Sequence, residues 1–252
     1  MLEVTHLVKE FGGLRAVNDV SFRLRANTIS GLIGPNGAGK TTLFNTIAGL
    51  YRPTAGEIVF LGRRITGSAP HRVFGEGLVR TFQIPRPFAA MTVLENCMLV
   101  PRRQAGERFW NNWVRRATVR AEERRCRDRA LQVLTFLGLA SHAGEYAKNL
   151  SGGQQKLLEL ARVLMADPKL ILLDEPGAGV NPSLLVTIMD KLRELNARGI
   201  TFLIIEHNMD LVMTLCDPVL VMAQGKLILE GPPAQVRTDP RVLEAYLGGV
   251  PA

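Results

Sequence analysis

The sequence predicts an α/β fold with a parallel sheet, an N-terminal antiparallel β subdomain and an inserted α-helical subdomain. Three observations support this class. An apolar segment, a glycine-rich turn and a helix follow one another over 29–48, helical patterns extend from about 93 to 165, and a strand-helix-strand pattern covers 170–222. Strands that alternate with helices are typical of a parallel sheet whose connections cross its faces.

The segments on either side complete this architecture. Alternating apolar and polar residues predict short antiparallel strands at 2–4, 20–24 and 56–60. Two further apolar runs on either side of 223–225 predict a hairpin, and a helix is expected at 241–247. A chain of 252 residues with 46% hydrophobic content is large enough for a sizeable core. We expect one domain with its core at 1–90 and 166–235, the helical subdomain at 91–165, a basic insertion at 101–129 and a C-terminal helix in 236–252.

The glycine-rich turn fits the phosphate-binding pattern GxxxxGK[ST]. It comprises Gly34, Pro35, Asn36, Gly37, Ala38, Gly39, Lys40 and Thr41, followed by Thr42. Its backbone N–H groups and the following helix N-terminus would face phosphate oxygens, Lys40 would add a positive charge, and Thr41 would offer a hydroxyl to Mg²⁺. A chance glycine-rich turn is the alternative. The correct flanking elements favour a nucleoside triphosphate site.

Two later apolar strands end in residues suited to phosphoryl chemistry. The strand 170–173 is followed by Asp174 and Glu175, which we expect to hold Mg²⁺ and to polarise an attacking water, respectively. The strand 201–205 is followed by Glu206 and His207, and His207 is a candidate contact to the γ-phosphate. A solvated acidic turn and a hydrogen-bonded structural histidine are the alternatives.

A second helix start has the features of an anion site. Ser151 is expected to cap a helix that continues through Gly152, Gly153 and Gln154, and its apolar positions follow at helical spacing. The two glycines would let a phosphate approach the free N–H groups closely. A plain capped helix explains the same residues.

Charge and composition narrow the class of protein. The formal net charge is +8, and 102–129 holds ten arginines against four acidic residues, with Phe109, Trp110 and Trp113 among them. Such a segment favours a membrane interface or a partner protein, while a solvated helix face and nucleic acid remain alternatives. No run of eighteen apolar residues and no secretory leader is evident, so we expect a cytoplasmic chain. The three cysteines lack metal-type spacing.

Taken together, the motifs resemble the nucleotide-binding subunits of ATP-binding cassette (ABC) transporters, along essentially the whole chain. LSGGQQ at 150–155 matches the signature sequence of that family and stands upstream of LILLDEP, as it does there. The resemblance implies a P-loop NTPase core of the ABC ATPase type. It also implies that Gln83 in RTFQ is the Q-loop glutamine at the metal, that His207 is the switch histidine, and that Phe11 stacks on adenine. A buried core phenylalanine is the alternative for Phe11.

The resemblance further implies how such a subunit works. ATP and Mg²⁺ bound to one subunit would be covered by Ser151, Gly152, Gly153 and Gln154 of a second cassette, identical or different, in a head-to-tail dimer. Glu175 and His207 would act in hydrolysis. The partners would be transmembrane permease subunits and a substrate-binding protein, and the chain would lie on the cytoplasmic face of the cell membrane. No nucleic acid is expected.

Shorter sequence motifs suggest which substrate is transported. RTFQIPRPF, GVNP and EHNMD resemble the branched-chain amino acid subfamily, although cassettes for urea, amides or lipopolysaccharide share much of this pattern. Asn181 stands where many family members have aspartate. Asparagine keeps the size of aspartate without its charge, and it can still cap a helix or hydrogen-bond across the dimer. A soluble cassette ATPase that acts on nucleic acid would carry the same motifs, whereas a small-molecule kinase would share only the phosphate loop.

Overall fold

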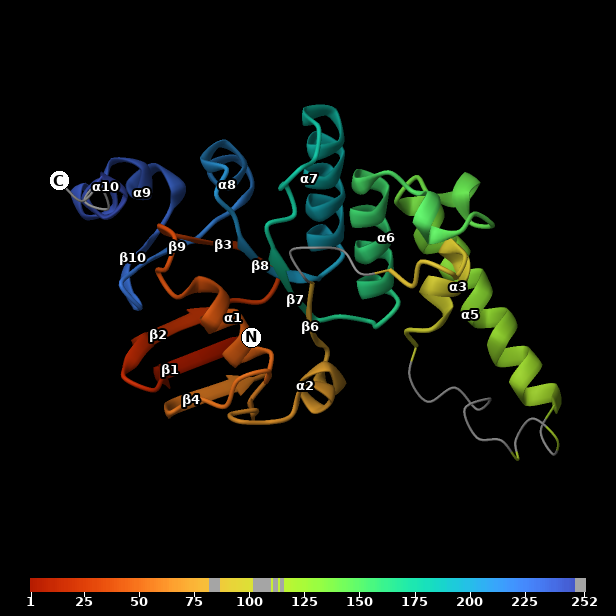
Figure 1. Ribbon diagram of the computed structural model, residues 1–252, viewed down its shortest axis with the longest axis horizontal. Coiled ribbons are helices and arrows are strands. Elements are labelled where there is room, and N and C mark those ends of the chain that lie inside the picture. Colours follow the sequence, from red (N-terminus) through yellow and green to blue (C-terminus); the bar gives the residue numbers. More distant parts are fainter. Residues whose placement is uncertain (82–86, 102–109, 111–112, 114–115, 248–252) are drawn as a thin grey trace. The chain divides into compact units, whose positions relative to one another are not determined.

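The computed structural model describes the chain except for 82–86, 102–109, 111–112, 114–115 and 248–252. It divides into two compact units. A sheet unit comprises 1–83, 169–178 and 189–252, and a helical unit comprises 84–168 and 179–188. The predicted α/β class is confirmed, since the sheet unit combines parallel strands with helices (Figure 1).

The elements follow one another along the chain as the alternating pattern predicts. The strands are β1 (Leu2–Phe11), β2 (Leu14–Leu24), β3 (Ile29–Ile33), β4 (Ala55–Phe60), β5 (Arg63–Arg64), β6 (Leu78–Arg80), β7 (Leu170–Asp174), β8 (Thr201–Ile205), β9 (Val219–Ala223) and β10 (Lys226–Gly231). The helices are α1 (Lys40–Ile47), α2 (Pro70–Glu76), α3 (Val93–Met98), α5 (Arg116–Phe136), α6 (Gly152–Leu164), α7 (Pro182–Ala197), α8 (Met209–Leu215), α9 (Pro233–Thr238) and α10 (Pro240–Leu247).

The larger sheet places the ends of three apolar strands, β3, β8 and β7, side by side. Its order is β10-β9-β3-β8-β7-β6, and every neighbouring pair is parallel except β10 with β9. Strands β3, β7 and β8 are buried along their full lengths, which explains their continuous apolar sequences. Asp174 lies opposite Ile205, and Ile205 lies opposite Leu32. The loops after these three strands therefore open at one edge of the sheet.

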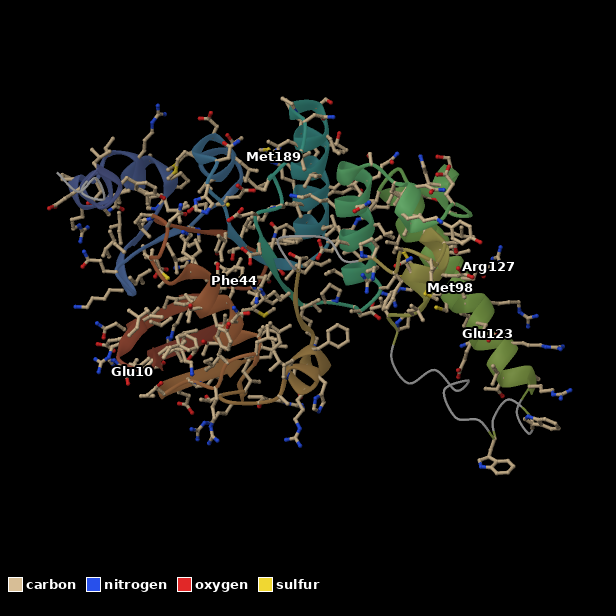
Figure 2. All side chains as sticks on the ribbon, viewed as in Figure 1. Glu10, Phe44, Met98, Glu123, Arg127 and Met189 are labelled. Atoms are coloured by element: carbon tan, nitrogen blue, oxygen red, sulfur yellow. The ribbon has the colours of Figure 1, made fainter. Side chains whose placement is uncertain are left out.

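The smaller sheet is antiparallel, as the N-terminal alternation predicts, with the order β2-β1-β4-β5. Strands β1 and β2 have 10 and 11 residues, so they are longer than the short strands expected from the sequence. Buried side chains from both sheets and from α1 form one apolar cluster, to which α1 contributes Leu43, Phe44 and Ile47. Phe44 is fully buried, and Figure 2 labels it on α1. This packing fixes α1 behind the glycine-rich loop.

The described residues up to Leu247 contain two C-terminal helices where one was expected. Asp239 separates α9 from α10, and Pro240 then occupies the first position of α10, where its missing N–H is tolerated. Both helices belong to the sheet unit.

The helical unit is built on α3, α5 and α6. Thr92 and Glu95 form a capping box at α3, and buried Val119, Ala130 and Leu134 line one side of α5. Within the described part of the chain, no helix combines the length and apolar character needed to cross a bilayer.

Candidate active site

The glycine-rich loop joins the buried strand β3 to helix α1 through three glycines with positive φ. Gly34, Gly37 and Gly39 have φ values of 148°, 77° and 96°. A Cβ on Gly34 would lie 2.0 Å from the carbonyl oxygen of Met222, and one on Gly39 would lie 2.2 Å from that of Ala16. Because any side chain would collide with backbone, these two positions require glycine.

Helix α1 begins directly after the loop and presents its N-terminus without a side-chain cap. Gly39 makes no side-chain capping bond, and no acidic residue occupies the first turn. The first N–H groups and the helix dipole therefore provide partial positive charge for an anion. Thr41 is exposed at this end of the helix, and Thr42 is half-buried.

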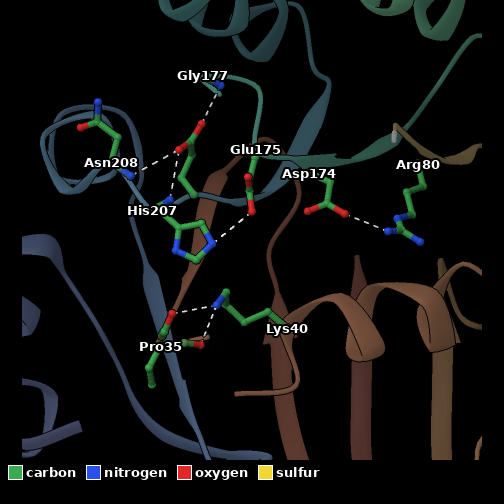
Figure 3. A network of polar contacts seen from close by, with 10 residues as sticks. Pro35, Lys40, Arg80, Asp174, Glu175, Gly177, His207 and Asn208 are labelled. Carbon is green, nitrogen blue, oxygen red and sulfur yellow. Dashed lines mark hydrogen bonds and ion pairs between the residues drawn. The ribbon is translucent and has the colours of Figure 1, made fainter. Parts of the chain in front are cut away.

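Lys40 adds a full positive charge to the same loop. Its Nζ donates hydrogen bonds to the carbonyl oxygens of Gly34 at 2.7 Å and Pro35 at 3.0 Å (Figure 3). Burial lowers the pKa of Lys40, while the nearby carboxylates of Glu175 and Asp174 act in the opposite direction. The loop thus holds its ammonium group in a defined position near the end of β7.

Asp174, the last residue of β7, forms a buried ion pair with Arg80 at the end of β6. Arg80 Nη2 lies 2.8 Å from Asp174 Oδ2, and the two side chains are 8% and 5% exposed (Figure 3). The Asp174 amide donates to Thr81 Oγ1 at 3.2 Å, and Arg80 also donates to Asn45 Oδ1. The sequence analysis assigned no role to Arg80. A basic residue at the end of an apolar strand is the sequence feature that could have identified it.

Glu175 and His207, predicted as the catalytic pair, lie in contact. Glu175 Oε1 is 3.0 Å from His207 Nε2, and the side chains are 18% and 43% exposed (Figure 3). Glu175 has a φ of 50°, and its amide donates to the Ile205 carbonyl oxygen at 2.9 Å. A positive φ outside glycine is uncommon, and such residues cluster at functional sites. A carboxylate held by an imidazole beside a phosphate loop can accept a proton from water.

Glu206 connects the two loops that carry this pair. Its side chain is almost fully buried. Its Oε1 accepts from the Gly177 amide at 2.7 Å, and its Oε2 accepts from the amides of His207 at 3.1 Å and Asn208 at 3.3 Å (Figure 3). The glutamate thus joins the loop after β7 to the loop after β8. The sequence placed Glu206 beside His207 but gave no indication of these contacts.

Phe11 lies at the end of β1 with an exposed ring. The residue is 42% exposed, and its ring packs edge-on against Tyr51 with centroids 5.1 Å apart. Lys9 Nζ lies 4.7 Å from its centroid. A core role is therefore excluded, and the ring is of the kind on which a base can stack.

A pocket of about 540 Å³ adjoins the phosphate loop and α10. It is lined by Pro35, Asn36, Gly37, Ala38, Ala223, Gln224, Ile228, Arg241, Glu244 and Ala245. Burial raises the pKa of Tyr246 on the same helix, near the Gly34 backbone. Asp174, Glu175 and His207 do not line this pocket, so it is separate from the Asp174 and Glu175 carboxylates.

In the helical unit, Ser151 caps α6 as predicted. Its Oγ accepts from the Gln154 amide at 3.3 Å, and Gln154 Oε1 accepts from the Ser151 amide at 2.9 Å. A Cβ on Gly153 would lie 2.2 Å from Leu184 Cδ2, whereas one on Gly152 would meet nothing within 4 Å. Leu184 therefore packs closely against Gly153, while Gly152 leaves open space at the helix start.

Two further predictions concern residues near these elements. Asn181 caps α7, since its Oδ1 accepts from the Leu184 amide at 2.8 Å and from Ser183 Oγ at 2.9 Å. Gln83, the predicted metal ligand, lies outside the described residues.

Comparison with known proteins places this geometry in a family. The ABC transporter family model matches residues 17–178, and the model "Branched-chain amino acid ATP-binding cassette transporter" matches 226–252. A probable branched-chain amino acid transport ATP-binding protein, LivG, of Archaeoglobus fulgidus is 43% identical and covers 98% of this chain and 95% of its own. The high-affinity LivG protein of Escherichia coli is 40% identical, with 98% of each chain covered.

Solved structures of ATP-binding cassettes are also similar to this chain. A nucleotide-free ATP-binding cassette from an ABC transporter superposes with a TM-score of 0.85 at 38% identity, covering 98% of both chains. An ATP-binding cassette in an ADP conformation gives 0.83 at 37% identity, again over 98% of both.

Proposed function

This chain belongs to the ATP-binding subunits of ABC transporters, and we propose that it hydrolyses ATP to energise the uptake of branched-chain amino acids through partner membrane subunits. The substrate class rests on the names of relatives that are about 40% identical over nearly the full chain. One geometric observation supports hydrolysis most directly, namely the 3.0 Å contact between Glu175 and His207 at the sheet edge that carries the phosphate loop.

Nucleotide binding would fall to the loop and to α1. The uncapped N-terminus of α1 and the Lys40 ammonium would hold the β- and γ-phosphates, and Phe11 would stack on adenine. Lys40 would exchange its bonds to the loop carbonyls for phosphate oxygens as ATP enters.

A divalent metal fits the oxygen donors beside this loop. The Thr41 hydroxyl and the Asp174 carboxylate would hold Mg²⁺, with Gln83 as a further ligand. When bound, Mg²⁺ would neutralise charge that develops on the phosphates. Arg80 pairs with Asp174 at 2.8 Å, so it would keep that carboxylate oriented.

Glu175 would accept the proton of the attacking water. His207 would orient Glu175 through Nε2 and would contact the γ-phosphate from the loop after β8. Glu206 would keep the two loops in register while this occurs.

The site would be completed by a second cassette. We infer that Ser151, Gly152, Gly153 and Gln154 of that cassette would cover the γ-phosphate, because the start of α6 offers free N–H groups and Gly152 leaves room for an anion. Transmembrane permease subunits and a substrate-binding protein would complete the transporter.

The proposal is tested by uptake in vesicles reconstituted with the permease subunits and the substrate-binding protein. Lys40→Ala should abolish both ATP hydrolysis and leucine uptake, whereas Lys226→Ala, at an exposed lysine in the β9–β10 hairpin, should retain both. ATP-dependent uptake of urea without uptake of leucine, isoleucine or valine would reject the substrate class. Light scattering of Glu175→Gln should show a doubled mass with ATP, and a monomer that binds ATP would reject a dimer of this chain alone.

A further inference from the structure

The basic segment of the helical unit has a defined shape on α5. Arg116, Arg120, Arg124 and Arg127 recur at intervals of four, four and three residues, which places them along one side of the helix. We call these four residues the arginine stripe. All four are exposed, and Figure 2 labels Arg127 on α5. The stripe is a surface feature that the ATP site does not use.

Other residues of α5 pack this helix against the rest of the helical unit. Val119, Ala130 and Leu134 are buried, and α5 packs against α3 and α6. Arg129 is engaged within the unit by Asp167. The segment 116–129 contains six arginines and three acidic residues, so this part of the helix has a net positive charge.

Two exposed indole rings precede α5 in the chain. Trp110 and Trp113 are 75% and 67% exposed. Arg116 Cζ lies 5.8 Å from the centroid of the Trp113 ring, so a guanidinium and an indole face share one place on the surface. Exposed indoles beside arginines suit the headgroup region of a bilayer, where the ring is partly desolvated and the cation meets lipid phosphate. A helix face that serves only solubility would not need them.

We propose that Trp113 and the arginine stripe form a contact surface for an anionic lipid bilayer. The stripe supplies the charge that attracts acidic headgroups, and the indole supplies interfacial affinity. Each arginine near an anionic surface adds about fivefold to the partition coefficient at moderate salt. The attraction between the arginines and the lipid headgroups should weaken as the salt concentration is raised, because charges exposed to solvent are screened. This proposal does not depend on ATP hydrolysis.

The test uses the full chain with vesicles of phosphatidylcholine, with or without phosphatidylglycerol. Trp110 and Trp113 are the two tryptophans of the sequence, so intrinsic tryptophan emission comes only from Trp113 of the proposed surface and from Trp110, three positions before it. Wild-type protein should sediment with the phosphatidylglycerol vesicles, and its emission should shift to shorter wavelength. Replacing Arg120, Arg124 and Arg127 together by glutamine should lower the partition coefficient on the order of a hundredfold.

A matched control removes the same charge elsewhere. Arg25, Arg72 and Arg237 are exposed residues of the sheet unit, and their joint replacement by glutamine should leave binding close to wild type. Both variants should retain wild-type affinity for a fluorescent ATP analogue, which shows that they are folded. Equal losses in the two variants, or sedimentation without an emission shift, would overturn the proposal. Soluble polyglutamate bound as tightly as the anionic vesicles would assign the stripe to an acidic protein surface instead.

Discussion

Replacing Arg80 by methionine should destabilise the sheet unit strongly, because it leaves a buried carboxylate without its cation. The Arg80–Asp174 pair spans 2.8 Å, with side chains 8% and 5% exposed. Breaking a buried pair by removing one partner costs about 3–5 kcal/mol. For a protein of this size that loss corresponds to a fall in Tm of roughly 6–20 °C. Thermal unfolding followed by circular dichroism measures it directly.

The chain contains a matched control for this change. Arg63 and Glu76 form a similar pair at 3.0 Å, but their side chains are 73% and 37% exposed. Arg63→Met should therefore cost at most about 1 kcal/mol. Added Mg²⁺ and ADP should reduce the loss in Arg80→Met, since a cation at Asp174 would replace the missing charge. Equal falls in Tm for the two variants would refute the reasoning.

Three further outcomes are expected. Glu175→Gln should cut steady-state phosphate release by about 10²–10⁴-fold, with nucleotide affinity retained. Gly39→Ala should destabilise the protein by more than about 1 kcal/mol in urea unfolding, because φ is 96° and a Cβ would lie 2.2 Å from a backbone oxygen. Burial raises the pKa of Cys97 and Cys216 to about 12, so iodoacetamide should alkylate the less buried Cys126 first, as read by mass spectrometry. The stability linked to the two buried thiols is present below pH 9 and is lost as pH rises toward 12.

Each of these outcomes has a defined contradiction. Unchanged turnover in Glu175→Gln would remove that residue from the role of base. Gly13→Ala is the control for Gly39→Ala, because a Cβ on Gly13 would meet nothing within 4 Å, and equal costs would contradict the packing argument. Alkylation of Cys97 before Cys126 in native protein would contradict the assigned burial.

The fold could be predicted where short-range patterns carry it. The turn after β3 is specified within eight residues, and the continuous apolar sequences of β7 and β8 predict buried parallel strands. The carboxyl ends of such strands meet at one edge, so the proximity of Glu175 and His207 followed from position in sequence.

The parts that could not be predicted depend on contacts between distant segments. Arg80 and Asp174 are separated by 94 positions, and their pairing requires β6 to lie beside β7. Leu184 meets Gly153 from another helix, so the glycine's packing role is invisible in the signature sequence itself. The strand β6 has three residues, too few for a periodic pattern to reveal it.

The hydrogen bonds of Glu206 bear on how this protein could be trapped with bound ATP. Glu206 holds the backbones after β7 and β8 through the amides of three residues, and the side chains of Glu175 and His207 take no part in those bonds. A substitution at either of these two proposed catalytic side chains should therefore leave the backbone frame beside the phosphate loop intact. Glu175→Gln is then suited to arresting the assembled transporter in one conformation for structure determination, whereas a substitution at Glu206 would release the frame itself.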